Sequence, residues 1–222
     1  MDGIAIEGLT LDFAEWRLFE NFSLTIANGR VTALLGRSGV GKSTLLRTIA
    51  GLARPAAGRV LRSGAVAWMA QDDLLLPWAS ALDNVVLGAR LRGEALDYAR
   101  ARTLLAEVGL SAQADSLPHT LSGGERQRVA LARTLMEDRA IVLMDEPFAS
   151  LDALTREEVQ ALAMKLLDGR TVVLVTHDPL EAANLADEIV VLAGRPARVA
   201  ARIETGSASV NEAVRAALAG AP

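Results

Sequence analysis

A glycine-rich segment between an apolar run and a helix-forming run carries the most specific chemical pattern in the chain. Residues 36–43 read G-R-S-G-V-G-K-S and match the phosphate-loop pattern G-x-x-x-x-G-K-S/T. Glycines let the backbone curl so that successive N–H groups and a helix N-terminus surround phosphate oxygens. Within it, the ammonium of Lys42 is expected to contact the β- and γ-phosphates, and the hydroxyl of Ser43 to ligate Mg²⁺. The nucleotide contacts predicted for this segment are Gly36, Arg37, Ser38, Gly39, Val40, Gly41, Lys42, Ser43 and Thr44.

A second pattern places two acids at the end of an apolar run. Residues 141–147 read I-V-L-M-D-E-P, so Asp145 ends a predicted strand and Glu146 follows it. Asp145 is expected to hold Mg²⁺ through water or an outer-shell contact. Glu146 is then placed to orient and deprotonate a water that attacks the γ-phosphate. Taken alone the pattern is common, but after a phosphate loop it predicts the second half of a nucleotide site.

A third pattern predicts a second anion-binding helix start. Residues 121–128 read L-S-G-G-E-R-Q-R, with Ser122 as the cap and Gly123 and Gly124 exposing backbone N–H groups. This segment resembles the signature motif of ATP-binding cassette (ABC) ATPases, which other phosphate-loop proteins lack. In that family the motif faces the γ-phosphate of the opposite subunit. The resemblance therefore implies that Ser122, Gly123, Gly124 and Glu125 contact ATP bound to a second copy, in a head-to-tail dimer.

The remaining family pattern occurs in order along the chain. By resemblance, Gln71 senses Mg²⁺ and the γ-phosphate, and His177 contacts the γ-phosphate. Asp152 lies in the loop that crosses the dimer interface, although the family more often has S-A-L-D where this chain has A-S-L-D. Phe13 occupies the position of an aromatic residue that stacks on adenine, and Trp16 is an open alternative.

Composition limits the classes of function. The chain has 222 residues, is 51% apolar and 23% charged, and carries a net charge of −4, which fits a packed globular domain. The acidic balance argues against holding nucleic acid by bulk electrostatics, and no nucleic-acid partner is predicted. With no cysteine, disulfides, thiolate zinc sites and a cysteine nucleophile are excluded. Lys42 is one of only two lysines, which strengthens the phosphate-loop interpretation.

Hydrophobic periodicity indicates an α/β fold. Residues 4–11 and 22–26 are predicted as N-terminal antiparallel strands, and residues 30–35, 65–69, 141–144, 171–176 and 189–193 as buried strands of a mainly parallel sheet. Helices are predicted within 42–52, 79–108, 123–138 and 210–218. The expected fold is thus a P-loop NTPase with a central mainly parallel sheet, an N-terminal antiparallel β region and an inserted α-helical subdomain. We expect one domain over residues 1–222, with the helical subdomain at about 72–138 inserted in a RecA-like core.

No run approaches the roughly 18 apolar residues of a membrane span, and the start shows no secretory signal. We therefore expect a cytoplasmic chain that works peripherally at the cytoplasmic face of the inner membrane through a partner. The runs Q-D-D-L-L-L-P-W at 71–78 and L-D-A-L-T-R at 151–156, with Arg195-Pro196, resemble the nitrate, sulfonate and taurine importer branch, which also includes pyrimidine-precursor importers.

The resemblance implies the ATP-binding and ATP-hydrolysing subunit of an ABC importer for a small solute, with ATP and Mg²⁺ as cofactors. Its expected partners are a second copy of itself, integral membrane permease subunits that contact residues 74–87, and indirectly a substrate-binding protein. The open alternatives are an efflux or lipoprotein-releasing system and a soluble, non-transport ABC ATPase. The L-L-L-P-W run favours import over efflux.

Overall fold

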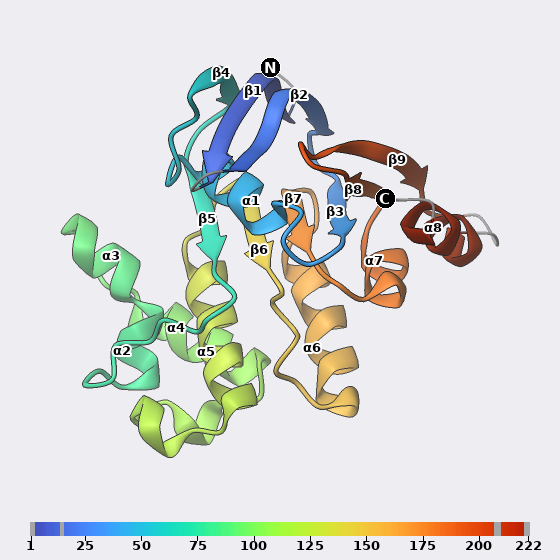
Figure 1. Ribbon diagram of the computed structural model, residues 1–222. Helices are drawn as coiled ribbons and strands as arrows, with labels where there is room; N and C mark the ends of the chain where they lie inside the picture. The colour runs from blue at the N-terminus through green and yellow to red at the C-terminus, as the bar shows by residue number, and fades with distance from the viewer. Residues whose placement is uncertain (1–2, 14–15, 207–209, 220–222) are drawn as a thin grey trace.

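A six-stranded sheet forms the centre of the molecule (Figure 1). The computed structural model describes residues 3–13, 16–206 and 210–219, and for Phe13 the backbone alone. Along the sheet the strands lie in the order β5 (Val66–Met69), β6 (Ile141–Asp145), β7 (Thr171–Val175), β3 (Val31–Gly36), β8 (Glu188–Ala193) and β9 (Arg198–Glu204). All neighbouring pairs are parallel except β8 and β9. The predicted mainly parallel sheet is confirmed.

The direction of these strands decides where the functional residues meet. Because parallel strands point the same way, the segments that follow them emerge along one edge of the sheet. Gln71 follows β5, Glu146 follows β6, His177 follows β7 and the phosphate loop follows β3. The strands β6, β7 and β8 are buried along their whole length, as expected for a sheet covered on both faces.

A separate antiparallel sheet of β1 (Gly3–Phe13), β2 (Trp16–Ala27) and β4 (Ala57–Arg62) confirms the predicted N-terminal β region. Helix α1 (Lys42–Ala50) packs in the hydrophobic core that joins this sheet to one face of the central sheet. Strands β4 and β9 were not predicted. Their side chains are exposed or only partly buried, so they lack the apolar runs by which the other strands are recognised.

The regular elements between β5 and β6 are all helices. It contains α2 (Ala81–Val85), α3 (Leu87–Arg92), α4 (Tyr98–Glu107), the 3₁₀ turns Ser111–Gln113 and Pro118–Thr120, and α5 (Gly123–Met136). The stretch predicted as mainly helical over 79–108 is three helices, because Gly93 takes a left-handed conformation after α3 and Asp97 starts α4 anew. Its apolar side chains share one core with the central sheet. That this segment is a distinct subdomain remains our proposal.

Three further helices cover the remaining surfaces. Helix α6 (Ala153–Leu166) joins the core that contains α5, whereas α7 (Pro179–Leu185) and α8 (Val210–Ala219) pack at β3 and β8 (Figure 1). The helix predicted at 210–218 is confirmed. Among the described residues, no helix has the length and apolar character needed to cross a membrane.

Candidate active site

A cavity of about 600 Å³ opens at the phosphate loop and brings together residues from five separate segments. It is lined by Leu18, Ser38, Gly39, Gly41, Lys42, Ser43, Thr44, Gln71, Glu146 and His177. Two glycines of the loop have no room for a side chain. A Cβ at Gly36 would lie 2.4 Å from the carbonyl oxygen of Leu192, and one at Gly41 would lie 2.9 Å from the ring of Phe19. The loop can therefore curl only because these positions are glycine.

Backbone carbonyl groups of the phosphate loop hold the side chain of Lys42 in place. Its ammonium donates to the carbonyl oxygens of Gly36 (2.8 Å) and Arg37 (3.2 Å), and the residue is 7% exposed. Burial lowers the pKa of Lys42, while the charges of Glu146 and Asp145 oppose this change. A phosphate in the loop would add negative charge and so favour the charged ammonium further. The N-cap of α1 is Gly41, which has no side chain to cap the helix, so this helix start suits an anion.

Ser43 and Asp145 meet beside the loop. The Ser43 hydroxyl donates to Oδ1 of Asp145 at 3.0 Å, and Asp145 is 1% exposed. Burial raises the pKa of this carboxyl group, and the hydrogen bond from Ser43 opposes the rise. A nearby cation would favour the charged carboxylate. A buried carboxylate next to a hydroxyl provides the hard oxygen atoms that Mg²⁺ prefers, so these residues fit the ion.

Glu146 and His177 lie side by side in the cavity, just after the neighbouring strands β6 and β7. Nδ1 of His177 lies 3.2 Å from Oε2 of Glu146. The backbone N–H of Glu146 donates to the Val175 carbonyl oxygen at 2.9 Å, which ties the residue to β7. Glu146 has a φ of +48°, a left-handed conformation that is rare outside glycine and is concentrated at functional sites.

Gln71 reaches the same cavity from a segment that α5 anchors. Nε of Arg126 lies 2.9 Å from a carboxylate oxygen of Asp73. Arg133 donates to the backbone carbonyl oxygens of Asp73 (2.6 Å) and Leu74 (2.9 Å). Sequence reasoning missed both anchors. Their spacing places the two arginines on one face of α5 two turns apart, but it does not show which loop that face meets.

A second missed network supports the segment that carries His177. The hydroxyl of Thr176 accepts from the backbone N–H of Asp178 at 3.0 Å and donates to the carboxylate of Glu181. Gln160 of α6 donates to the same carboxylate at 2.7 Å. Burial raises the pKa of Glu181. This network fixes the turn after β7, and with it the position of the His177 backbone.

Asn84 organises the turn that follows Gln71. The side chain is fully buried, accepts from the backbone N–H of Leu76 at 2.8 Å, and donates to the carbonyl oxygens of Leu76, Ala79 and Ser80. One side chain thus satisfies the backbone groups of the run that leads into α2.

Asn84→Ala is expected to lower the free energy of unfolding by about 2–4 kcal/mol, because buried backbone groups lose their partners. Urea denaturation followed by circular dichroism measures this change. Asn211→Ala, at an exposed position on α8, is the matched control and should change stability by less than about 0.5 kcal/mol. Equal effects of the two substitutions would contradict the role of Asn84.

The signature segment lies at a separate place on the chain. The Ser122 hydroxyl accepts from the N–H of Glu125 at 3.2 Å, and the Ser122 N–H donates to the Glu125 carboxylate at 2.7 Å. This capping box lowers the pKa of Glu125, chiefly through the backbone N–H of Ser122. A Cβ at Gly124 would lie 3.4 Å from Leu151, so the helix start packs beside the loop that contains Asp152.

The predicted contacts thus divide between two surfaces. In the described part of the chain, none of Ser122, Gly123, Gly124, Glu125 and Asp152 lines the phosphate-loop cavity. Asp152 caps α6 by accepting from the backbone N–H of Thr155 at 3.1 Å, and hydrogen bonds with the side chain and then the backbone of Thr155 lower its pKa. One copy therefore presents a phosphate-loop surface and a signature surface that do not meet within the chain. A contact of the signature surface with nucleotide held by a second copy stays a prediction.

Among the predicted nucleotide contacts of the phosphate loop, Gly36, Arg37 and Val40 are not in the lining of this cavity. Arg37 and Val40 line a different cavity beside the loop, and their contact with nucleotide stays a prediction. The Phe13 side chain lies outside the described residues. Trp16 pairs with Phe13 in the register of β1 and β2, and it is 66% exposed. Which of the two stacks on adenine stays open.

The sheet order, the loop after β3 and the acids after β6 define an α/β nucleotide-hydrolysing protein of the phosphate-loop class. Comparison with known families gives a more specific answer: residues 19–149 match the ABC transporter model, and the chain belongs to this family. It is an ATP-binding cassette ATPase, as predicted.

The chain is 50% identical over 199 residues to an aliphatic sulfonates import ATP-binding protein of Nocardia farcinica, covering 89% of this chain and 78% of that protein. It is 42% identical over 219 residues to the taurine import ATP-binding protein of Pseudomonas aeruginosa, covering 91% and 83%. A solved dimeric ATP-binding cassette in a post-hydrolysis state, bound to ADP and Pi, superimposes with a TM-score of 0.83 at 29% identity, covering 92% of this chain and 99% of the other. The fold prediction is confirmed.

Proposed function

We propose that this chain is the ATP-binding and ATP-hydrolysing subunit of an ABC importer that takes up a small sulfonated solute. The observation that supports hydrolysis is the convergence of Lys42, Ser43, Gln71, Glu146 and His177 on one cavity. The proposal for the solute rests on the relatives that are named for the import of aliphatic sulfonates and taurine.

In this proposal each side chain has one task. The phosphate loop and Lys42 hold the β- and γ-phosphates, while Ser43, Asp145 and Gln71 hold Mg²⁺. The bound ion supplies positive charge to the phosphate oxygens. Glu146 orients the attacking water and takes its proton as the water oxygen bonds to the γ-phosphorus and the bond to ADP breaks. His177 contacts the γ-phosphate, and its 3.2 Å approach to Glu146 is consistent with both acting on one group.

A second copy completes the site. We propose that two copies close head to tail, so that the helix start at Ser122 faces ATP held by Lys42 of the other copy. Ser122 and Gly123 are exposed, and the solved cassettes that resemble this chain are dimeric. ATP then favours the closed dimer because only that state supplies all of its contacts.

The membrane partner is proposed to contact residues 74–87. This segment exposes two large apolar side chains, Leu74 (61% exposed) and Trp78 (75% exposed), beside the anchored turn after Gln71. Movement of Gln71 with ATP would therefore reach the permease through a short, firmly held connection. In this arrangement the chain lies peripherally at the cytoplasmic face of the membrane, and a substrate-binding protein delivers the solute to the permease.

The test is recovery of the tagged chain from its native membranes in mild detergent, with mass spectrometry of the proteins that copurify. A multi-span permease is expected with the wild type, and its loss is expected with Leu74→Ser/Trp78→Ala. Leu52→Ala, which also removes an exposed leucine (68% exposed), is the matched control. Recovery of only soluble partners, such as ribosomal or DNA-repair proteins, would contradict the transport role and leave the ATP site standing.

A further inference from the structure

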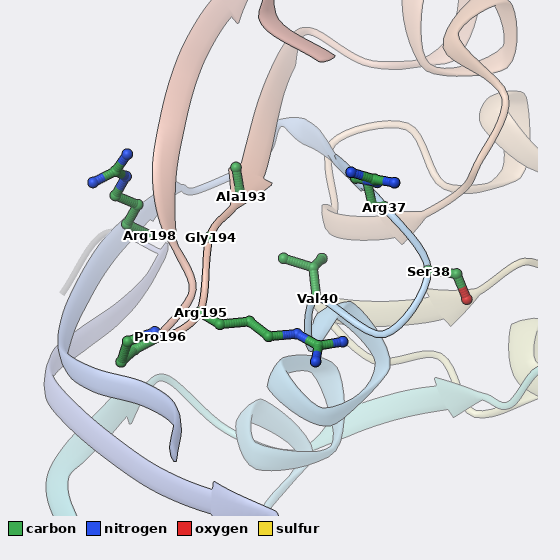
Figure 2. Close-up of a pocket in the computed structure, with 8 residues that line it drawn as sticks. All are labelled: Arg37, Ser38, Val40, Ala193, Gly194, Arg195, Pro196 and Arg198. Carbon is green, nitrogen blue, oxygen red and sulfur yellow. The ribbon is translucent and has the colours of Figure 1, made fainter. Parts of the chain in front are cut away.

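A second cavity, of about 750 Å³, lies beside the phosphate loop and is lined by three arginines (Figure 2). Arg37 belongs to the loop, whereas Arg195 lies in the turn between β8 and β9 and Arg198 begins β9. Figure 2 shows the Arg195 side chain extending toward the loop, where its Nη2 would lie 3.8 Å from a Cβ at Gly39. This cavity and the nucleotide cavity share only Ser38 among their described lining residues.

The turn that carries Arg195 is fixed to the body of the protein. The backbone N–H of Ala197 donates to the Leu18 carbonyl oxygen at 2.8 Å, and Ala197 forms a β-bridge with Phe19. Ala197 is itself buried at 4% exposure. The side chains of Arg195 and Arg198 therefore extend from an anchored segment of backbone. Anchoring of the backbone limits the conformational freedom that is lost when a ligand binds.

In the residues that the structure describes, none of the three guanidinium groups makes an ion pair or a hydrogen bond, and no carboxylate lines the cavity. Some exposed arginines elsewhere do pair, such as Arg59 with Glu7 at 2.8 Å and Arg92 with Glu94 at 2.9 Å. Positive charges that line one cavity repel each other, and they raise the local concentration of anions.

We propose that this cavity binds a small oxyanion of the phosphate, sulfate or sulfonate class, at a site separate from the nucleotide. The planar fork of a guanidinium matches two oxygens of such a group, so each of the three arginines that line the cavity can bind it through two hydrogen bonds. Small ligands bind in cavities more often than on flat protein surfaces, so this cavity fits a small ligand. The inference does not depend on the proposed transport role.

The test measures binding of inorganic sulfate by calorimetry at constant ionic strength, with the full chain saturated with Mg²⁺ and the non-hydrolysable ATP analogue AMP-PNP. The analogue fills the phosphate loop, so sulfate cannot bind there. Saturable binding is expected for the wild type, and Arg195→Gln/Arg198→Gln should weaken it at least about tenfold. Arg54→Gln/Arg215→Gln removes two exposed arginines elsewhere and should change it less than about twofold.

Affinity for AMP-PNP is measured first for every variant, and normal values show that the chain is folded. Absence of saturable sulfate binding by the wild type, or equal binding by the Arg195→Gln/Arg198→Gln variant, would overturn the proposal. A wild type that fails to bind AMP-PNP would instead contradict the proposed function. In that case, sulfate binding by the wild type and the two double variants is compared without nucleotide. Weaker binding by Arg195→Gln/Arg198→Gln alone would still support the anion site.

Discussion

Glu146→Gln is expected to bind ATP with near-normal affinity and to hydrolyse it at least about a hundredfold more slowly. The amide keeps the size and hydrogen-bonding oxygen of the carboxylate but cannot accept a proton from water. Because hydrolysis reopens the proposed dimer, this variant should accumulate as an ATP-bound dimer. Phosphate release gives the rate, and gel filtration with and without ATP gives the oligomeric state.

Glu157→Gln, at an exposed position on α6, makes the same chemical change away from the cavity and should leave the rate unchanged. Near-normal turnover by Glu146→Gln would contradict the role of Glu146 as the general base. His177, whose Nδ1 lies 3.2 Å from the Glu146 carboxylate, would then be the next candidate.

Lys42→Ala is expected to lower ATP affinity by about two orders of magnitude or more, because a charge-assisted contact to phosphate is worth about 1.5–3 kcal/mol and the loop also loses its internal brace. That brace is the pair of hydrogen bonds from Lys42 to the carbonyl oxygens of Gly36 and Arg37. Fluorescence titration with a labelled ATP analogue measures the affinity, and circular dichroism confirms that the fold remains.

The only other lysine provides the control. Lys165→Ala lies at an exposed position on α6 and should bind ATP as the wild type does. If Lys42→Ala kept the wild-type affinity, the phosphate-loop assignment would be wrong.

Local patterns could be predicted because their chemistry is contiguous in the sequence. Residues 36–43 contain the end of a strand, the loop and the start of a helix in one run. The phosphate loop can therefore be identified without knowledge of the sheet. The convergence of Gln71, Glu146 and His177 is different, because it depends on the order β5-β6-β7-β3 of the strands. Strand periodicity does not contain that order. The resemblance to a family supplied Gln71 and His177, whereas Glu146 was predicted from its place after an apolar run. The order of the strands explains why the three residues meet.

Other features could not be predicted because they depend on tertiary contacts. The strand β9 has an alternating exposure pattern and few strongly apolar side chains, so pairing with β8 defines it more than its composition does. Arg133 is an ordinary helix residue in the sequence, and its role follows only from its contacts with the turn after Gln71. The basic cavity likewise forms only when the β8–β9 turn packs against the loop.

The division of the nucleotide contacts between two surfaces is the central claim, and mixing two inactive variants tests it most directly. Glu146→Gln lacks the base, and Ser122→Arg blocks the signature surface, so each alone should be nearly inactive. In a mixed dimer, the phosphate loop and Glu146 of the Ser122→Arg copy meet the intact Ser122 of the other copy, which restores one site.

Equal mixing gives mixed pairs in half of the dimers, each with one intact site of two, so about a quarter of the wild-type ATPase rate is expected. Copurification of differently tagged copies in ATP establishes that mixed dimers form. If those dimers remain as inactive as either variant alone, a site completed by the second copy is contradicted.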